Sequence, residues 1–150
     1  MDARNIGLRN IEVADTKISS IDGENGKLIY RGYDILDLVN HSTFEETAYL
    51  LLFGELPDKT ELDEFSYKLK QSRKLPHSLI ANLENKPKTA RPMDVLQSTV
   101  PSLADFDESI YSDTKEDNIK RAISLISKIP SIVSAWNRIR KGEEIIEPDE

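Results

Sequence analysis

The chain has 150 residues, 38% of them hydrophobic and 31% charged, and a formal net charge of -7. This length predicts one compact unit with a single core, and the acidic charge argues against nucleic acid as a partner because it would repel a phosphate backbone. The sequence contains no cysteine, which excludes disulfides and thiolate metal sites. Its apolar runs are too short to cross a bilayer and the N-terminus lacks a signal-peptide core, so we expect a cytoplasmic protein without a membrane partner.

A hairpin and a short helix are predicted first. Residues 16–30 read TKISSIDGENGKLIY, in which two β-rich segments flank an Asp-Gly and an Asn-Gly, and the turn should lie near Asp22 to Gly26. Asp34 then precedes four apolar residues at helical spacing and is a candidate N-cap. These apolar residues are Ile35, Leu36, Leu38 and Val39.

A second helix is predicted over 43–53. Ser42 and Glu45 have the spacing of a capping box, Gly54 suits a left-handed helix end, and Pro57 prevents continuation. The apolar set on its expected inner face is Phe44, Ala48, Leu51 and Leu52.

A third helix should begin with Thr60 as its cap and carry one apolar stripe, and a weaker helix should occupy Ser78 to Glu84. The stripe consists of Leu62, Phe65 and Leu69. Further on, Pro92 fits the first position of a helix, and Pro101 should kink or end it. Its expected stripe is Met93, Leu96 and Val100.

The clearest helix begins at Thr114 and ends at Gly142. Its apolar residues keep a period near 3.6 past an internal Pro130, where a kink is expected. They are Ile119, Ala122, Ile123, Ile126, Val133, Trp136 and Ile139. About six helices behind one hairpin make this a mainly α protein.

Four segments follow one another along the chain and carry a family resemblance: IDGENGKLIYRGYDILDL, STFEETAYLLLFGELPDKTEL, RPMDVLQSTV and SKIPSIVSAWNRIRKGEEI. Together with Tyr-Arg-Gly-Tyr at 30–33, they resemble the start of citrate synthases of the compact bacterial and archaeal type, over roughly residues 6–148. The resemblance implies a multihelical, mainly α fold with a small N-terminal β-hairpin. Residues 1–150 would form the N-terminal portion of the large domain, with the small domain absent from this chain.

Two positions depart from the family pattern. Members commonly carry His-Pro-Met where this chain has Arg91-Pro92-Met93, and a small or polar residue in place of Pro101. The first departure argues against a nucleotide effector site of the kind that some bacterial members build near that histidine. The second argues against a straight helix at this point.

The resemblance implies a chemistry that this chain cannot perform alone. Citrate synthases condense acetyl-CoA with oxaloacetate and then hydrolyse the citryl thioester, using an aspartate, histidines and several arginines. All of these lie downstream of the region that matches here. We therefore assign no catalytic, cofactor-binding or metal-binding residue, expect no cofactor because acetyl-CoA is a substrate, and expect the isolated chain to be inactive.

The residues themselves agree with that assignment. His41 and His77 lie in no triad or metal spacing and are interpreted as surface or capping histidines. The neighbouring carboxylates Glu45 and Glu46 diverge on a helix and are interpreted as a solvated face.

Three further features have a functional and a structural interpretation. Gly23 and Gly26 lack the strand-to-helix context of a phosphate loop and favour a turn. Arg31 could bind an anion, but a structural salt bridge is the favoured interpretation. Trp136 could form a ligand wall, but helix-packing core is favoured.

The resemblance also implies a homodimer through helices 92–104 and 114–141. The second helix carries more apolar residues than a single-sided surface helix needs, including Leu125, Ile129 and Ile132. A second expected partner is the missing downstream part of the same polypeptide, since the tail EEIIEPDE resembles the bridge into the family's next helix.

Three alternatives stay open. The first is a fragment of a 2-methylcitrate synthase, which uses propionyl-CoA. The second is a stand-alone, non-catalytic helical dimerisation module. The third is an unrelated α-helical binding domain.

Overall fold

The computed structural model describes residues 14–149. The chain divides into two compact units, Met1–Leu62 and Asp63–Glu150. The expectation of one compact unit is therefore wrong. The hairpin strands and the first helix contact mainly each other, so they gather into a unit of their own. No helix of the described residues is long and apolar enough to cross a membrane.

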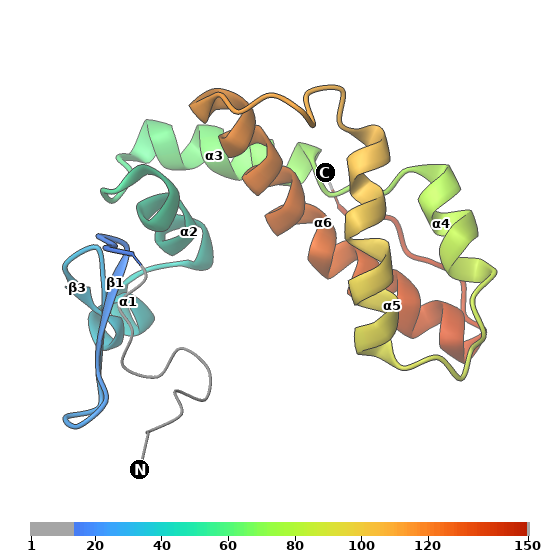
Figure 1. The fold of residues 1–150 in the computed structure, drawn as a ribbon, viewed down its shortest axis with the longest axis horizontal. Helices are drawn as coiled ribbons and strands as arrows, with labels where there is room; N and C mark the ends of the chain where they lie inside the picture. The colour runs from blue at the N-terminus through green and yellow to red at the C-terminus, as the bar shows by residue number, and fades with distance from the viewer. Residues whose placement is uncertain (1–13, 150) are drawn as a thin grey trace, which may run out of the picture. The chain divides into compact units, whose positions relative to one another are not determined.

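The first unit contains a three-stranded antiparallel sheet in the order β1-β2-β3 (Figure 1). β1 (Ser19–Asp22) and β2 (Lys27–Tyr30) form the predicted hairpin, and Asp22 pairs with Lys27 at the turn. β3 (Tyr33–Asp34) is a short strand that the sequence did not predict. The sheet therefore has one strand more than expected.

The turn between β2 and β3 explains the missed strand. Arg31 and Gly32 have φ of 49° and 94°, the pair of positive values that a type I′ hairpin turn requires. The backbone N–H of Arg31 donates to the carbonyl of Ile18 at 2.9 Å. Arginine rarely adopts positive φ, so an Arg-Gly pair gives a weaker turn signal than Asn-Gly.

Two helices follow the sheet. α1 (Ile35–His41) begins at the predicted N-cap, where the Asp34 side chain accepts from the Leu36 N–H at 2.9 Å. α2 (Phe44–Phe53) begins with a capping box of Thr43 and Glu46, so the predicted box of Ser42 and Glu45 is wrong by one residue.

The Thr43 box is reciprocal. The Glu46 carboxylate accepts from the Thr43 N–H at 2.7 Å, and the Glu46 N–H donates to the Thr43 hydroxyl at 3.2 Å. Ser42 instead donates its hydroxyl to the Glu46 carboxylate at 3.2 Å. The two candidate boxes have identical spacing, so only the position of the helix start separates them.

The buried face of α2 also differs from the prediction. Ala48 and Leu50 are buried, whereas Phe44 is 67% exposed. The predicted inner face therefore holds for Ala48 but fails at Phe44. Gly54 ends the helix with φ 102°, in the left-handed conformation that was expected.

α3 (Lys59–Gln71) begins one residue before Thr60, which is therefore not its cap. Asp58 and Glu61 form the reciprocal bonds instead: the Glu61 N–H donates to the Asp58 carboxylate at 2.8 Å, and the Asp58 N–H to the Glu61 carboxylate at 2.9 Å. Phe65 and Leu69 are buried as predicted.

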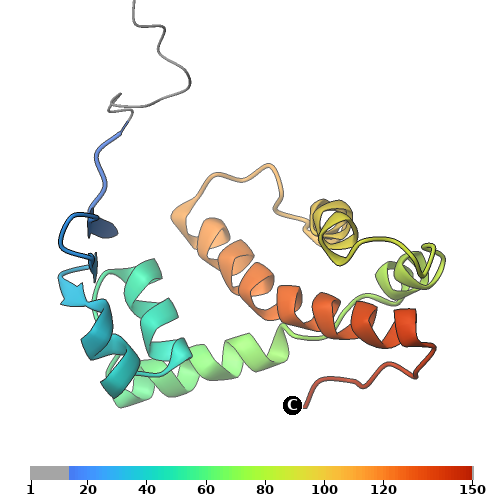
Figure 2. The same ribbon diagram turned by 90° about the horizontal axis from the view of Figure 1, so that it is seen from below.

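The second unit is built on three packed helices and a 3₁₀ turn. α4 (His77–Glu84) and α5 (Pro92–Thr99) both pack against α6 (Lys115–Lys141), and η1 (Pro101–Phe106) continues α5 (Figure 2). Their buried side chains and Leu75, which precedes α4, form one core, made of Leu75, Leu79, Leu83, Val95, Leu103, Ile132, Ala135, Trp136 and Ile139.

The two prolines around α5 behave as predicted. Pro92 occupies the start of the helix, and Pro101 ends it and begins the 3₁₀ segment. The predicted stripe is wrong at Met93, which is 70% exposed. Val95 and Thr99 are buried instead, because the helix turns a different face toward α6.

α6 has both predicted ends. The Thr114 hydroxyl accepts from the Asp117 N–H at 3.2 Å, and Gly142 adopts φ 74°. The helix continues through Pro130, and the kink expected there stays a prediction. The predicted stripe fails at Val133, which is 51% exposed. The buried residues of α6 are Ile123, Ser127, Ile132, Ala135, Trp136 and Ile139.

Candidate functional site

The two histidines are both exposed, His41 in the last turn of α1 and His77 at the start of α4. Their interpretation as surface histidines is confirmed. Within residues 14–149, no group of three or more His, Cys, Asp or Glu side chains is placed to hold a metal ion.

The ion pairs found within residues 14–149 do not include Arg31, so the predicted salt bridge is not seen there. The Nη2 of Arg31 donates to the backbone carbonyl of Leu51 at 3.1 Å, near the C-terminal end of α2. Helix C-terminal carbonyls lack an intrahelical partner, so a guanidinium there satisfies one of them and opposes the negative end of the helix dipole. The Nε atom is buried without a hydrogen-bond partner. Arg31 is therefore a helix-capping residue of the first unit.

Trp136 lies in the core, as predicted, and is only 3% exposed. It also lines a pocket of about 200 Å³ between α5 and α6, whose other lining residues include Leu96 and Arg140. Its indole Nε1 is buried without a hydrogen-bond partner. This small pocket is mainly apolar.

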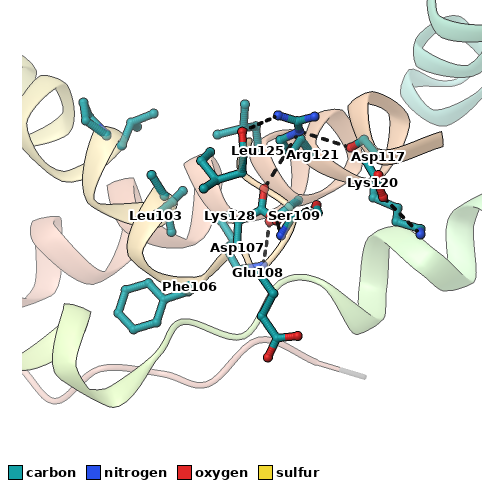
Figure 3. A pocket seen from close by; sticks show the side chains of 15 residues that line it. Leu103, Phe106, Asp107, Glu108, Ser109, Asp117, Lys120, Arg121, Leu125 and Lys128 are labelled. Atoms are coloured by element: carbon teal, nitrogen blue, oxygen red, sulfur yellow. Dashed lines mark hydrogen bonds and ion pairs between the residues drawn. The ribbon is translucent and has the colours of Figure 1, made fainter. Parts of the chain in front are cut away.

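A cavity of about 630 Å³ is the candidate functional site, and sequence reasoning did not point to it. The end of α5, η1, the loop 107–114 and the first half of α6 line it (Figure 3). Five charged side chains line it besides Glu108, and we call them the ion cluster: Asp107, Asp117, Lys120, Arg121 and Lys128. Figure 3 shows Phe106 and Glu108 pointing away from Arg121 and Asp117.

Arg121 connects α6 to the loop 107–114. Its Nη1 donates to the Ile110 carbonyl at 3.1 Å, its Nη2 to the Ser112 carbonyl, and its Nε to the Asp117 carbonyl at 3.3 Å. The Nε also lies 3.9 Å from Oδ2 of Asp107, an ion pair without a hydrogen bond. The guanidinium therefore holds the loop in place largely through backbone carbonyls.

Asp107 is organised by its own turn. Its Oδ1 accepts from the backbone N–H and the hydroxyl of Ser109 at 2.8 and 2.7 Å. These hydrogen bonds, more than the nearby Arg121, hold the pKa of Asp107 below its usual value. The carboxylate is thus ionised at neutral pH.

Asp117 is held even more strongly in its ionised form. Its Oδ2 accepts from the hydroxyls of Ser112 and Thr114 at 2.6 and 2.8 Å. The Ser112 bond is the largest cause that lowers the pKa of Asp117 to about 2, and Lys120 adds an ion pair at 3.4 Å. This carboxylate cannot act as a proton carrier near neutral pH.

Lys128 is the half-buried cation of the cluster. Its Nζ donates to the Ser72 carbonyl at 2.9 Å and to the Ser124 hydroxyl at 3.0 Å. Burial lowers its pKa, because a charged ammonium loses hydration there. The bond to Ser72 ties α6 to the residue that follows α3.

The cavity is not equipped for acid–base chemistry. Its two described aspartates are ionised and hydrogen-bonded, and neither histidine lines it. Of the two serines that line it, Ser109 donates to the Asp107 carboxylate and Ser124 accepts from Lys128. An activated nucleophile is therefore not formed among the described residues. The arrangement organises a loop and does not form a reaction centre.

Comparison with known proteins agrees with the resemblance found in the sequence. The family model described as "Citrate synthase, C-terminal domain" matches residues 7–150. The citrate synthase of Haloferax volcanii is 38% identical over 148 residues, which cover 96% of this chain and 39% of that protein. The 2-methylcitrate synthase 1 of Corynebacterium glutamicum is 39% identical over 145 residues, which cover 95% and 38%.

A solved structure supports the fold as well. The crystal structure of citrate synthase from Pyrobaculum aerophilum superposes with a TM-score of 0.86 at 33% identity. The match covers 95% of this chain and 38% of that one. The chain thus spans about two fifths of the length of the relatives it matches. With its sequence matched almost throughout and its helices superposed, the chain belongs to the citrate synthase family.

Proposed function

We propose that this chain is the N-terminal portion of the large domain of a cytoplasmic citrate synthase, an enzyme that condenses acetyl-CoA with oxaloacetate and water to give citrate and CoA. One observation carries the proposal: residues 7–150 match the family model, yet the chain spans only 39% of the Haloferax volcanii citrate synthase. The small domain and the catalytic residues would then belong to the rest of the polypeptide, which would also be the first partner of this chain.

The candidate site supports this division. Condensation needs a base for the methyl group of acetyl-CoA, a donor for the enolate and cations for a dicarboxylate. In the described cavity both aspartates are held ionised, and Arg121 donates to three backbone carbonyls. The chain would therefore contribute a helical scaffold and not the reacting groups.

Reading the coding sequence beyond Glu150 tests the assignment. We expect an in-frame continuation rich in the histidines and arginines that the family uses. The longer polypeptide should release a thiol from acetyl-CoA when oxaloacetate is present, and the 150-residue chain should not. A stop codon directly after Glu150, or turnover by the short chain that survives repurification, would overturn the proposal. The stop codon would favour the stand-alone dimerisation module.

A 2-methylcitrate synthase is the second candidate. The chain is 39% identical to the Corynebacterium glutamicum 2-methylcitrate synthase 1 and 38% identical to the Haloferax volcanii citrate synthase, so the two types of relative are equally similar. Comparing kcat/KM of the longer polypeptide for acetyl-CoA and propionyl-CoA separates them. A higher value for propionyl-CoA would favour 2-methylcitrate synthase.

A second copy of the chain is the other partner that we propose, through helices 92–104 and 114–141. Exposed apolar side chains on α5 and α6 support it: Met93 is 70% exposed, Val133 51% and Leu125 37%. Ile132, one of the extra apolar residues that favoured a dimer, is buried in the core of the second unit beside Trp136, so neither side chain can face a partner.

The dimer is tested with Val133→Asp, which places a charge on the exposed apolar surface without entering the core. Sedimentation equilibrium should show a dimer for the unaltered chain, a monomer for Val133→Asp and a dimer for the control Lys115→Ala, which is exposed at the start of α6. A folded 17.0 kDa monomer for the unaltered chain would contradict the proposal.

A further inference from the structure

The turn between β1 and β2 contains Asn25-Gly26, which is the only Asn-Gly pair in the sequence. Both residues are exposed. Gly26 has φ 63°, and apart from Gly26 and its two chain neighbours no residue has an atom within 4 Å of the place where a Cβ would stand. Gly26 therefore has no side chain of its own to shield its backbone nitrogen, and the space where one would stand is open.

Asp22 holds Asn25 from the other side of the turn. The Asn25 N–H donates to Asp22 Oδ1 at 3.1 Å, and the Asn25 Nδ2 donates to Asp22 Oδ2 at 2.7 Å. The side-chain bond is the largest cause that lowers the pKa of Asp22. Both the amide that would react and the carboxylate that restrains it are thus defined by the structure.

We propose that Asn25 is a self-modification site, at which the Gly26 backbone nitrogen displaces the Asn25 side-chain amide at a rate that Asp22 limits. The Gly26 nitrogen loses its proton and forms a bond to Cγ of Asn25. The Cγ–Nδ2 bond breaks, and the nitrogen leaves as ammonia with that proton. A five-membered succinimide results, and water opens it at either carbonyl to give aspartate or isoaspartate.

The reaction replaces a hydrogen-bond donor of the turn by a negatively charged carboxylate. A carboxylate replaces the Nδ2 donor that lay 2.7 Å from Asp22 Oδ2, so an attraction becomes a repulsion between like charges. The isoaspartate product also adds one methylene to the main chain between Asp22 and Lys27, which are paired in the hairpin. Since hairpin register depends on loop length, this product should loosen the end of the sheet.

The site is tested by incubating the 150-residue chain at mildly alkaline pH and mapping its peptides by mass spectrometry. Asn25 should gain the mass of an amide-to-acid conversion before Asn82 in α4 and Asn118 in α6 do. Isomerisation at Asp22-Gly23 leaves the mass unchanged, so the mass gain reports Asn25 alone. Conversion of Asn25 no faster than that of Asn118 would overturn the proposal.

Two variants test the mechanism. Asp22→Ala removes the restraint and should speed conversion of Asn25 by roughly fivefold, the factor that corresponds to one net hydrogen bond. Gly26→Ala should slow the conversion of Asn25, because the added methyl group hinders attack by the backbone nitrogen. A peptide of residues 19–30 with the same substitution should convert more slowly than the unaltered peptide, which separates this effect from any change in the fold. An unchanged or slower rate in Asp22→Ala would overturn the role of Asp22, and an unchanged rate in both Gly26→Ala samples would overturn that of Gly26.

Discussion

Replacing Arg121 by methionine removes the guanidinium and keeps most of the aliphatic stem. The side chain of Arg121 donates three hydrogen bonds to backbone carbonyls, two of them in the loop between η1 and α6. Methionine fills similar space in the cavity but cannot donate. The variant should therefore release the loop 107–114 while leaving the core of the second unit packed.

The structure sets the size of the effect. A hydrogen bond contributes about 0.5–1.5 kcal/mol net, so three together amount to about 1.5–4.5 kcal/mol. The lower half of this range applies, because the Arg121 side chain is 24% exposed and water can replace part of what is lost. We expect the free energy of unfolding to fall by about 2 kcal/mol.

Urea unfolding measures the loss, and amide hydrogen exchange locates it. Exchange should accelerate at residues 108–113 and stay slow at Leu83 and Ile132, which are fully buried in the core. The matched control is Lys120→Met, the adjacent residue. Its ammonium is 62% exposed and pairs with Glu116 and Asp117 of its own helix, not with the loop, so its loss should matter little. Unaltered exchange at 108–113 in Arg121→Met would refute the role of Arg121 as the anchor of the loop.

Three further predictions concern the fold. Leu83→Ala should lower the free energy of unfolding by about 2–5 kcal/mol in a urea titration, whereas Leu83→Met should cost less than about 1.5 kcal/mol, because Leu83 is fully buried. Asp117 has a pKa lowered to about 2, so its stabilising effect should be present above about pH 4 and lost as pH falls toward 2. In Asp117→Asn the free energy of unfolding should therefore depend less on pH between about 4 and 2, and an unchanged dependence would contradict this. Gly54→Ala should lower the melting temperature because φ is 102°, whereas Gly23→Ala, where φ is not positive, should not.

Helix ends with one strong signal were predictable from the sequence. Asp34, Thr114, Pro92 and Gly142 each lie at the predicted end of a helix. The start of α2 was not, because Ser42-Thr43 and Glu45-Glu46 offer two capping boxes of identical spacing. Local chemistry cannot choose between them, and the burial of Ala48 and Leu50 accompanies the later start.

The candidate site was missed for a different physical reason. Arg121 and Lys128 donate mainly to backbone carbonyls, of Ile110, Ser112 and Ser72 among others, and any residue type provides a carbonyl. Such bonds leave no pattern of side chains in the sequence. The predicted helix start at Thr114 is correct, and its hydroxyl bonds to Asp117, but that prediction came from the apolar period of the helix and did not reveal the cavity.

These hydrogen bonds to backbone carbonyls occupy donors that a bound substrate would need. A cation holds a substrate carboxylate best when its donors are free to point at it, but Arg31 caps α2 and Lys128 donates to the residue that follows α3. Arg121 likewise uses its donors on the loop carbonyls, so binding a dicarboxylate there would have to displace bonds that hold the loop. Folding and substrate binding would compete for one set of donors. A dicarboxylate clamp would therefore need cations other than Arg31, Arg121 and Lys128.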